Sequence, residues 1–88
     1  MKPLRKECRE KQWEEVSDRV LDHAKTICKK FHGYNSSHEA LGVMVEEFKE
    51  FIDTLHDNNR EESIFEAIDL AAGFLVYIAL FSEEIKDE

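Results

Sequence analysis

The stretch that decides the fold is residues 68–81, IDLAAGFLVYIALF, in which every residue is apolar or glycine except Asp69. As a helix this segment is about 21 Å long at ~1.5 Å per residue. A bilayer core is about 30 Å thick, so we do not expect the segment to span a membrane. A helix that is apolar on all sides must instead be covered on all sides by protein.

The rest of the chain is too short to cover such a helix. With 88 residues, three Gly and one Pro, the sequence favours a few long helices and an all-α fold. Two further helices of similar length leave part of the apolar surface open. We therefore expect a homodimer or homotetramer, in which the second and third helices of two chains form a four-helix core.

Apolar periodicity and capping residues place three helices in one domain over residues 1–88. We predict helices over 10–32, 36–57 and 60–85, with residues 1–9 as a frayed arm. Ser36 and Glu39 fit a capping box before the second helix, and Asn59 and Glu62 fit one before the third. The first two helices carry one apolar stripe each, at steps of three and four: Trp13, Val16, Val20, Ala24, Ile27 and Phe31, then Leu41, Met44, Val45, Phe48, Ile52 and Leu55.

The charge is unevenly distributed along the chain. The net charge of −8 combines a basic first third with a strongly acidic remainder, because nine of the twelve Lys and Arg lie within residues 1–30. No basic face is available for a nucleic-acid duplex. The charged N-terminus lacks the apolar core of a signal peptide, and we interpret Cys8 and Cys28 as free thiols. We expect a cytoplasmic protein.

The acidic residues include two pairs with a suggestive spacing. Glu47 and Glu50 are three residues apart on the second helix, and so are Glu66 and Asp69 on the third. Residues at this spacing share a helix face, so the pairs converge if the two helices pack antiparallel. Divalent cations relieve the repulsion of four converging carboxylates, and oxygen ligands suit Mg²⁺ or Mn²⁺. The alternative is that both pairs are simply solvated.

Asp69 and Gly73 favour the site over the solvated alternative. Asp69 interrupts an apolar run, where an isolated carboxylate is costly unless it is paired, coordinated or protonated. Gly73 lies one turn later on the same side of the helix. Glycine within a helix costs about 1 kcal/mol relative to alanine, so it indicates close approach by a ligand or another helix.

These residues resemble a known motif. Glu47-x-x-Glu50, fifteen residues and then Glu66-x-x-Asp69 is similar to the ExxE…ExxD signature of the MazG-like, all-α nucleoside triphosphate pyrophosphohydrolases. The doubled glutamate at Glu46 and the helix that runs from Asp69 through Val76-Tyr77-Ile78 strengthen the resemblance. It covers roughly residues 13–82.

The resemblance implies hydrolysis of an NTP or dNTP between its α and β phosphates by a dimer or a dimer of dimers, in house-cleaning of the nucleotide pool. It implies that Mg²⁺ is held by Glu47, Glu50, Glu66 and Asp69. Glu46, Glu47 and Glu50 are the candidate catalytic residues, with Glu46 serving a second ion or the attacking water. For substrate binding we select Lys25 and Lys29 for the phosphates and Trp13 for stacking on the base.

Other functions remain open. Phosphoribosyl-ATP pyrophosphatase, a relative of similar size and acidic pattern, ranks second because its members typically have a Lys shortly before the doubled glutamate and a His after the tyrosine of the last helix. This chain has Val43 and Ile78 there. A non-catalytic helical module is a further alternative, in which Glu47 and Glu50 would point away from Glu66 and Asp69. The last alternative is that the chain is a member of the family that binds nucleotide but does not hydrolyse it.

Overall fold

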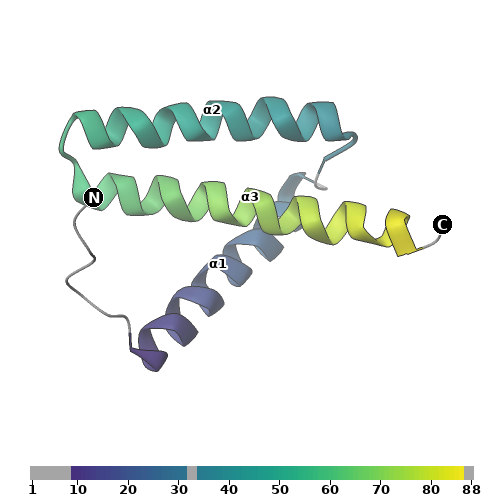
Figure 1. The fold of residues 1–88 in the computed structure, drawn as a ribbon, viewed down its shortest axis with the longest axis horizontal. Helices are drawn as coiled ribbons and strands as arrows, with labels where there is room; N and C mark the ends of the chain where they lie inside the picture. Colours follow the sequence, from purple (N-terminus) through teal and green to yellow (C-terminus); the bar gives the residue numbers. More distant parts are fainter. Residues whose placement is uncertain (1–8, 32–33, 87–88) are drawn as a thin grey trace, which may run out of the picture.

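The computed structural model describes residues 9–31 and 34–86, and the described part of the chain is three α-helices (Figure 1). They are α1 (Glu10–Phe31), α2 (Ser37–His56) and α3 (Arg60–Lys86). The predicted range of α2 is one residue longer at each end, because Ser36 and Asp57 are its caps. The predicted range of α3 ends one residue early. Nearly all of the predicted arm, Cys8, and the end of the first helix at His32-Gly33 lie outside the described residues.

At the starts of α2 and α3, the capping side chain accepts a backbone N–H as predicted, which is one of the two hydrogen bonds of a capping box. The Ser36 hydroxyl accepts the backbone N–H of Glu39 at 3.1 Å, and Asn59 Oδ1 accepts that of Glu62 at 3.1 Å. The carboxylate of Glu39 accepts a hydrogen bond from Asn35. Between α2 and α3, Asn58 has a φ of 56°, a left-handed conformation that asparagine tolerates well. The tight turn makes the two helices antiparallel neighbours.

The central helix is α3, which packs against both α2 and α1. Figure 1 shows α2 and α3 side by side, while α1 crosses α3 obliquely and its first turns project away. Small residues allow the close approach, since Ala24 of α1, Ala40 of α2 and Ala72 of α3 are buried, together with Val76. Trp13 and Val16 of the predicted α1 stripe lie on the projecting turns and are exposed.

A single chain leaves most large apolar side chains uncovered. On α2 the exposed ones are Leu41, Val45, Phe48 and Leu55, and on α3 they include Ile64, Phe74, Leu75 and Ile78. At about 100° per residue, both sets lie on the side of the α2–α3 pair opposite α1. No partner chain is described, so the predicted homo-oligomer stays a prediction, and this uncovered face is where we expect the second chain.

The segment Arg60–Ser82 of α3 is long and apolar enough to cross a membrane by length and composition. Core helices of soluble proteins meet the same criteria. Glu66 and Asp69 fall within this segment, and ionisable side chains are costly inside a bilayer. Our expectation that α3 is a protein core helix therefore stays a prediction, supported by its packing against two other helices.

Candidate functional site

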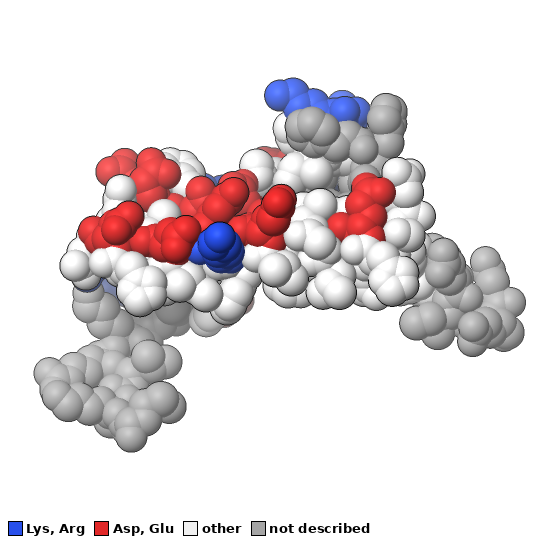
Figure 2. Space-filling model, turned by 90° about the horizontal axis from the view of Figure 1, so that it is seen from above, with Lys and Arg blue, Asp and Glu red and all other residues white. Residues whose placement is uncertain are grey.

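The four paired carboxylates converge on the α1 side of the α2–α3 pair. The pKa of Glu47 is raised from 4.5 to about 7, chiefly because its carboxyl group is partly buried. The next causes are the negative charges of Asp69, Glu50 and Glu66. Figure 2, which looks onto α2 from above the view of Figure 1, shows further acidic side chains gathered over that helix, with few basic ones among them. The antiparallel packing of α2 and α3 is what brings the two pairs together.

The pKa of Glu66 on α3 also indicates that the carboxylates lie close together. Burial raises its pKa first, followed by the charges of Glu50 and Asp69 and by a side-chain hydrogen bond with Glu50. Two carboxyl groups in such contact favour sharing a proton over ionising together. If the chain were a non-catalytic module, we expected the two carboxylate pairs to point away from each other. In the structure the two pairs lie close together.

Two oxygen atoms in this cluster fit a cation. Glu47 Oε2 and Glu66 Oε2 are shielded from solvent and have no hydrogen-bond partner among the described residues. A buried, unpaired carboxylate oxygen is costly, and a hard divalent cation would satisfy it. As they stand among the described residues, no three Asp, Glu, His or Cys side chains are arranged so that they could hold a metal ion together. Mg²⁺ suits such a site because it keeps several waters and takes substrate phosphates as further ligands.

A pocket of about 610 Å³ opens beside the carboxylates, between all three helices. This volume is within the range of small-molecule sites. Its lining combines apolar walls with a few polar groups: His23, Ile27, Tyr34, Glu39, Val43, Glu47 and Asp69. An organic group bound here would lie directly against two of the four carboxylates.

His23 is a member of this site that the sequence analysis missed. Its Nε2 lies 2.5 Å from Oδ1 of Asp69, which joins α1 to α3. The sequence did show that Asp69 needs a partner within its apolar surroundings. Ala24 belongs to the apolar stripe of α1, and a search beside that stripe would have reached its neighbour His23. Periodicity alone does not tell which helix supplies the partner of Asp69.

Tyr34, which lines the pocket, closely approaches α3 at Gly73. The Tyr34 hydroxyl donates a hydrogen bond to the Gly73 carbonyl at 3.4 Å. A Cβ on Gly73 would lie 2.9 Å from that hydroxyl and 3.4 Å from Oε2 of Glu47. The predicted close approach at Gly73 is therefore present. Burial, and next the charge of Glu47, raise the pKa of Tyr34, so its phenol stays a hydrogen-bond donor.

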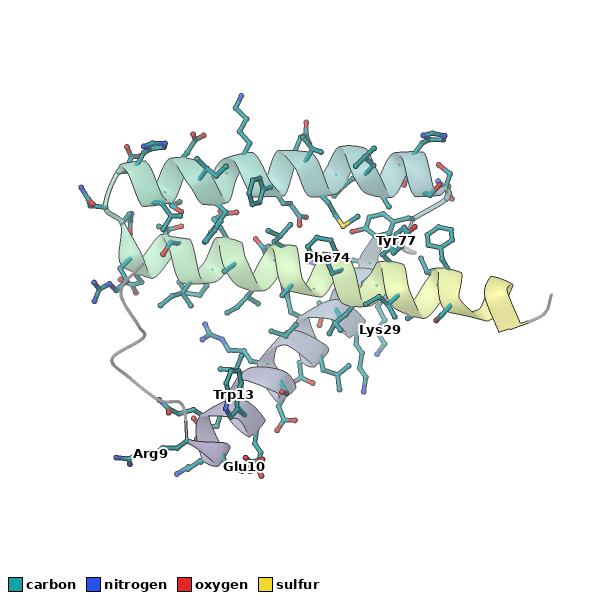
Figure 3. The ribbon with its side chains drawn as sticks, viewed as in Figure 1. Arg9, Glu10, Trp13, Lys29, Phe74 and Tyr77 are labelled. Atoms are coloured by element: carbon teal, nitrogen blue, oxygen red, sulfur yellow. The ribbon has the colours of Figure 1, made fainter. Side chains whose placement is uncertain are left out.

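The other selected residues lie away from the pocket. Glu46 is exposed and does not line it. Trp13 lies at the start of α1 and Lys29 near its end (Figure 3), and the Trp13 side chain is 57% exposed. Lys25 and Lys29 are exposed as well, and none of these three lines the pocket. Their substrate-binding roles stay predictions that the single chain does not support.

Arg19 is a cation that shares a groove with one of the four carboxylates. It lines a second groove of about 450 Å³, between α1 and α3, together with Asp69 and His23. Its guanidinium lies 5.6 Å from the ring centroid of Phe65, a cation–π contact that restrains it. The His23–Asp69 pair borders both the groove and the pocket. A substrate that reaches Asp69 therefore has a cation within the same groove.

The raised pKa of Glu47 gives a testable pH dependence. Its pKa is about 7 in the folded chain against 4.5 normally, so between these values the folded state binds a proton that the unfolded state does not. The free energy of unfolding therefore falls as pH rises from about 4.5 to about 7. Urea unfolding in EDTA at about pH 5 and about pH 8.5 should show this loss, and Glu47→Gln should reduce it. An equal loss in both proteins would contradict the assignment to Glu47.

The chain matches a known protein family. The family model described as Phosphoribosyl-ATP pyrophosphohydrolase matches residues 18–87. The matched range holds all four carboxylates, His23 and Tyr34, but not Trp13. No curated protein and no solved structure matches the chain.

Proposed function

The chain belongs to the phosphoribosyl-ATP pyrophosphohydrolase family, within the all-α NTP pyrophosphatase (MazG-like) superfamily, and we propose that it is a Mg²⁺-dependent enzyme that cleaves a nucleotide between its α and β phosphates. The family acts on phosphoric anhydrides of nucleotide-like substrates. The observation that carries the proposal is the pair of buried, unpartnered carboxylate oxygens on Glu47 and Glu66. Mn²⁺ would serve in place of Mg²⁺.

Glu47, Glu50, Glu66 and Asp69 are the residues that would hold the cation. When bound, it would neutralise phosphate charge and lower the pKa of a water that attacks the phosphorus. A carboxylate oxygen of the cluster that is not used for ligation accepts the proton of that water. Glu50 suits this role because it contacts Glu66 and is exposed to solvent. Glu46 is exposed and does not line the same chain's pocket, so we propose no role for it there.

The pocket is proposed to bind the nucleoside part of the substrate. Ile27 and Val43 provide apolar walls. The Tyr34 hydroxyl oxygen, whose hydrogen is donated to Gly73, and the Glu39 carboxylate provide hydrogen-bond acceptors. Among the cations, Arg19 is better placed than Lys25 or Lys29 to contact a phosphate, because it shares a groove with Asp69. A guanidinium is well suited to phosphate because it offers several fixed N–H donors.

Two substrates have specific support. The family match favours phosphoribosyl-ATP, which the sequence analysis ranked second and which we now place first. The (d)NTPs remain the second candidate, because Val43 and Ile78 replace the lysine and histidine typical of that family. Both reactions break the same bond and release pyrophosphate, so one active site serves either substrate.

Pyrophosphate release should be measured with phosphoribosyl-ATP and a panel of NTPs and dNTPs, in Mg²⁺, Mn²⁺ and EDTA. Metal-dependent release from phosphoribosyl-ATP with a much higher kcat/KM than from any NTP would support the first substrate. The reverse order would move the (d)NTPs to the front. A folded chain that releases pyrophosphate from none of these substrates would refute the proposed activity.

A further inference from the structure

We propose that His23 is a positioning residue for Asp69: its imidazole fixes the orientation of this carboxylate so that Asp69 presents its free oxygen to a divalent cation shared with Glu47 and Glu66. This inference rests on the proposed function, because it assigns a role to His23 in the metal site of that reaction. His23 does not itself ligate the cation in this arrangement, since its Nε2 is directed at Asp69.

The direction of the hydrogen bond follows from the chemistry of the two groups. An ionised carboxylate only accepts hydrogen bonds, so Nε2 of His23 carries the hydrogen and donates it to Oδ1 of Asp69, 2.5 Å away. Hydrogen bonds to charged acceptors are short and roughly twice as strong as neutral ones. The bond occupies one oxygen of Asp69 and leaves Oδ2 for a cation.

The packing of α1 holds His23 in place. Its neighbour Ala24 is buried against Ala72 and Val76 of α3, which fixes the backbone of α1 at this point. Among the described residues, the His23–Asp69 bond is also the one side-chain hydrogen bond that joins α1 to α3. A donor on a fixed backbone restrains its acceptor, whereas a water molecule does not.

Asp69 needs this restraint because of its surroundings. Asp69 lies in a cluster of carboxylates that includes Glu47 and Glu66, and like charges repel one another. Its side chain is 40% exposed, so without His23 it has room to rotate toward solvent. Hydrogen-bonding partners of metal ligands commonly contribute 10- to 100-fold to metal affinity.

The test is direct binding of Mn²⁺ to the whole chain, measured by electron paramagnetic resonance of the free ion without substrate. His23→Ala should weaken binding by about 10- to 100-fold. His23→Gln should stay within about threefold of the unaltered chain, because the glutamine amide N–H₂ replaces the Nε2–H donor. His38→Ala, at an exposed position on α2, serves as the matched control and should bind normally.

Rescue by glutamine separates positioning from packing, because glutamine restores the donor but not the aromatic ring. Should His23→Ala not fold, His23→Asn replaces it, since its shorter amide does not reach Asp69. The inference would be overturned if His23→Ala, or its replacement His23→Asn, bound Mn²⁺ normally. It would also be overturned if His23→Gln bound Mn²⁺ as weakly as that variant. Either result would leave the proposed function intact. Failure of the unaltered chain to bind Mn²⁺ would overturn both.

Discussion

Replacing Asp69 with asparagine is expected to lower the rate of pyrophosphate release by at least about a hundredfold at saturating substrate. Asparagine keeps the shape of aspartate and still accepts the hydrogen bond from His23, but it loses the charge that a divalent cation needs. Cation stabilisation of phosphoryl transfer amounts to several kcal/mol, and each 1.4 kcal/mol is about tenfold in rate. A hundredfold loss is therefore the smallest effect that the proposed site allows.

The control for this experiment is Asp53→Asn. Asp53 is an exposed carboxylate of α2 outside the pocket, so the same chemical change there should leave the rate within about twofold. Asp69→Asn should remain folded by circular dichroism, because it removes one charge from a crowded acidic cluster. Equal rates for the two variants would place the chemistry somewhere other than this carboxylate cluster.

The second large effect is expected from Phe48→Lys, which should convert the oligomer into monomers. Phe48 is 50% exposed in the single chain and lies at the centre of the uncovered apolar stripe of α2. Burying such a side chain contributes about 2 kcal/mol, and a symmetric dimer loses it twice. The dissociation constant should then rise by about a thousandfold, measured by analytical ultracentrifugation over a dilution series.

Asp53→Lys is the matched control, because it introduces the same residue on the solvated side of α2. It should leave the mass of the oligomer unchanged. If the unaltered chain is a monomer at all concentrations, the predicted four-helix core is wrong. If Phe48→Lys sediments like the unaltered chain, the second subunit does not pack on the stripe of α2.

The comparison of sequence and structure is informative at Asp69 and Gly73. Asp69 interrupts an apolar run and Gly73 weakens a helix, so each carries a local cost that needs a compensating contact. The sequence predicted that such contacts exist. It did not identify them as His23 and Tyr34, because both partners come from segments about forty residues away.

The apolar stripe of α2 is a second informative case. Its periodicity predicted a helix with one apolar stripe, and Leu41, Val45, Phe48 and Leu55 of that stripe are exposed in the single chain. Towards α3, Ala40 is buried and Met44 of the stripe lies beside Gly73. Alanine contributes little to hydrophobic periodicity, so the pattern marked mainly the face that is left open.

The sequence by itself determined the three helices, the ends of α2 and α3 to within one residue, and the two carboxylate pairs. Helix periodicity, capping and i, i+3 spacing act over only a few residues, so they can be recognised locally. The tertiary structure alone decided which groups surround Asp69. The oblique crossing of α1 over α3 brings His23 and Arg19 to the carboxylates and leaves Trp13, Lys25 and Lys29 outside the pocket. The crossing angle depends on how the surfaces of both helices pack against each other. It therefore cannot be predicted from the sequence pattern of either helix alone.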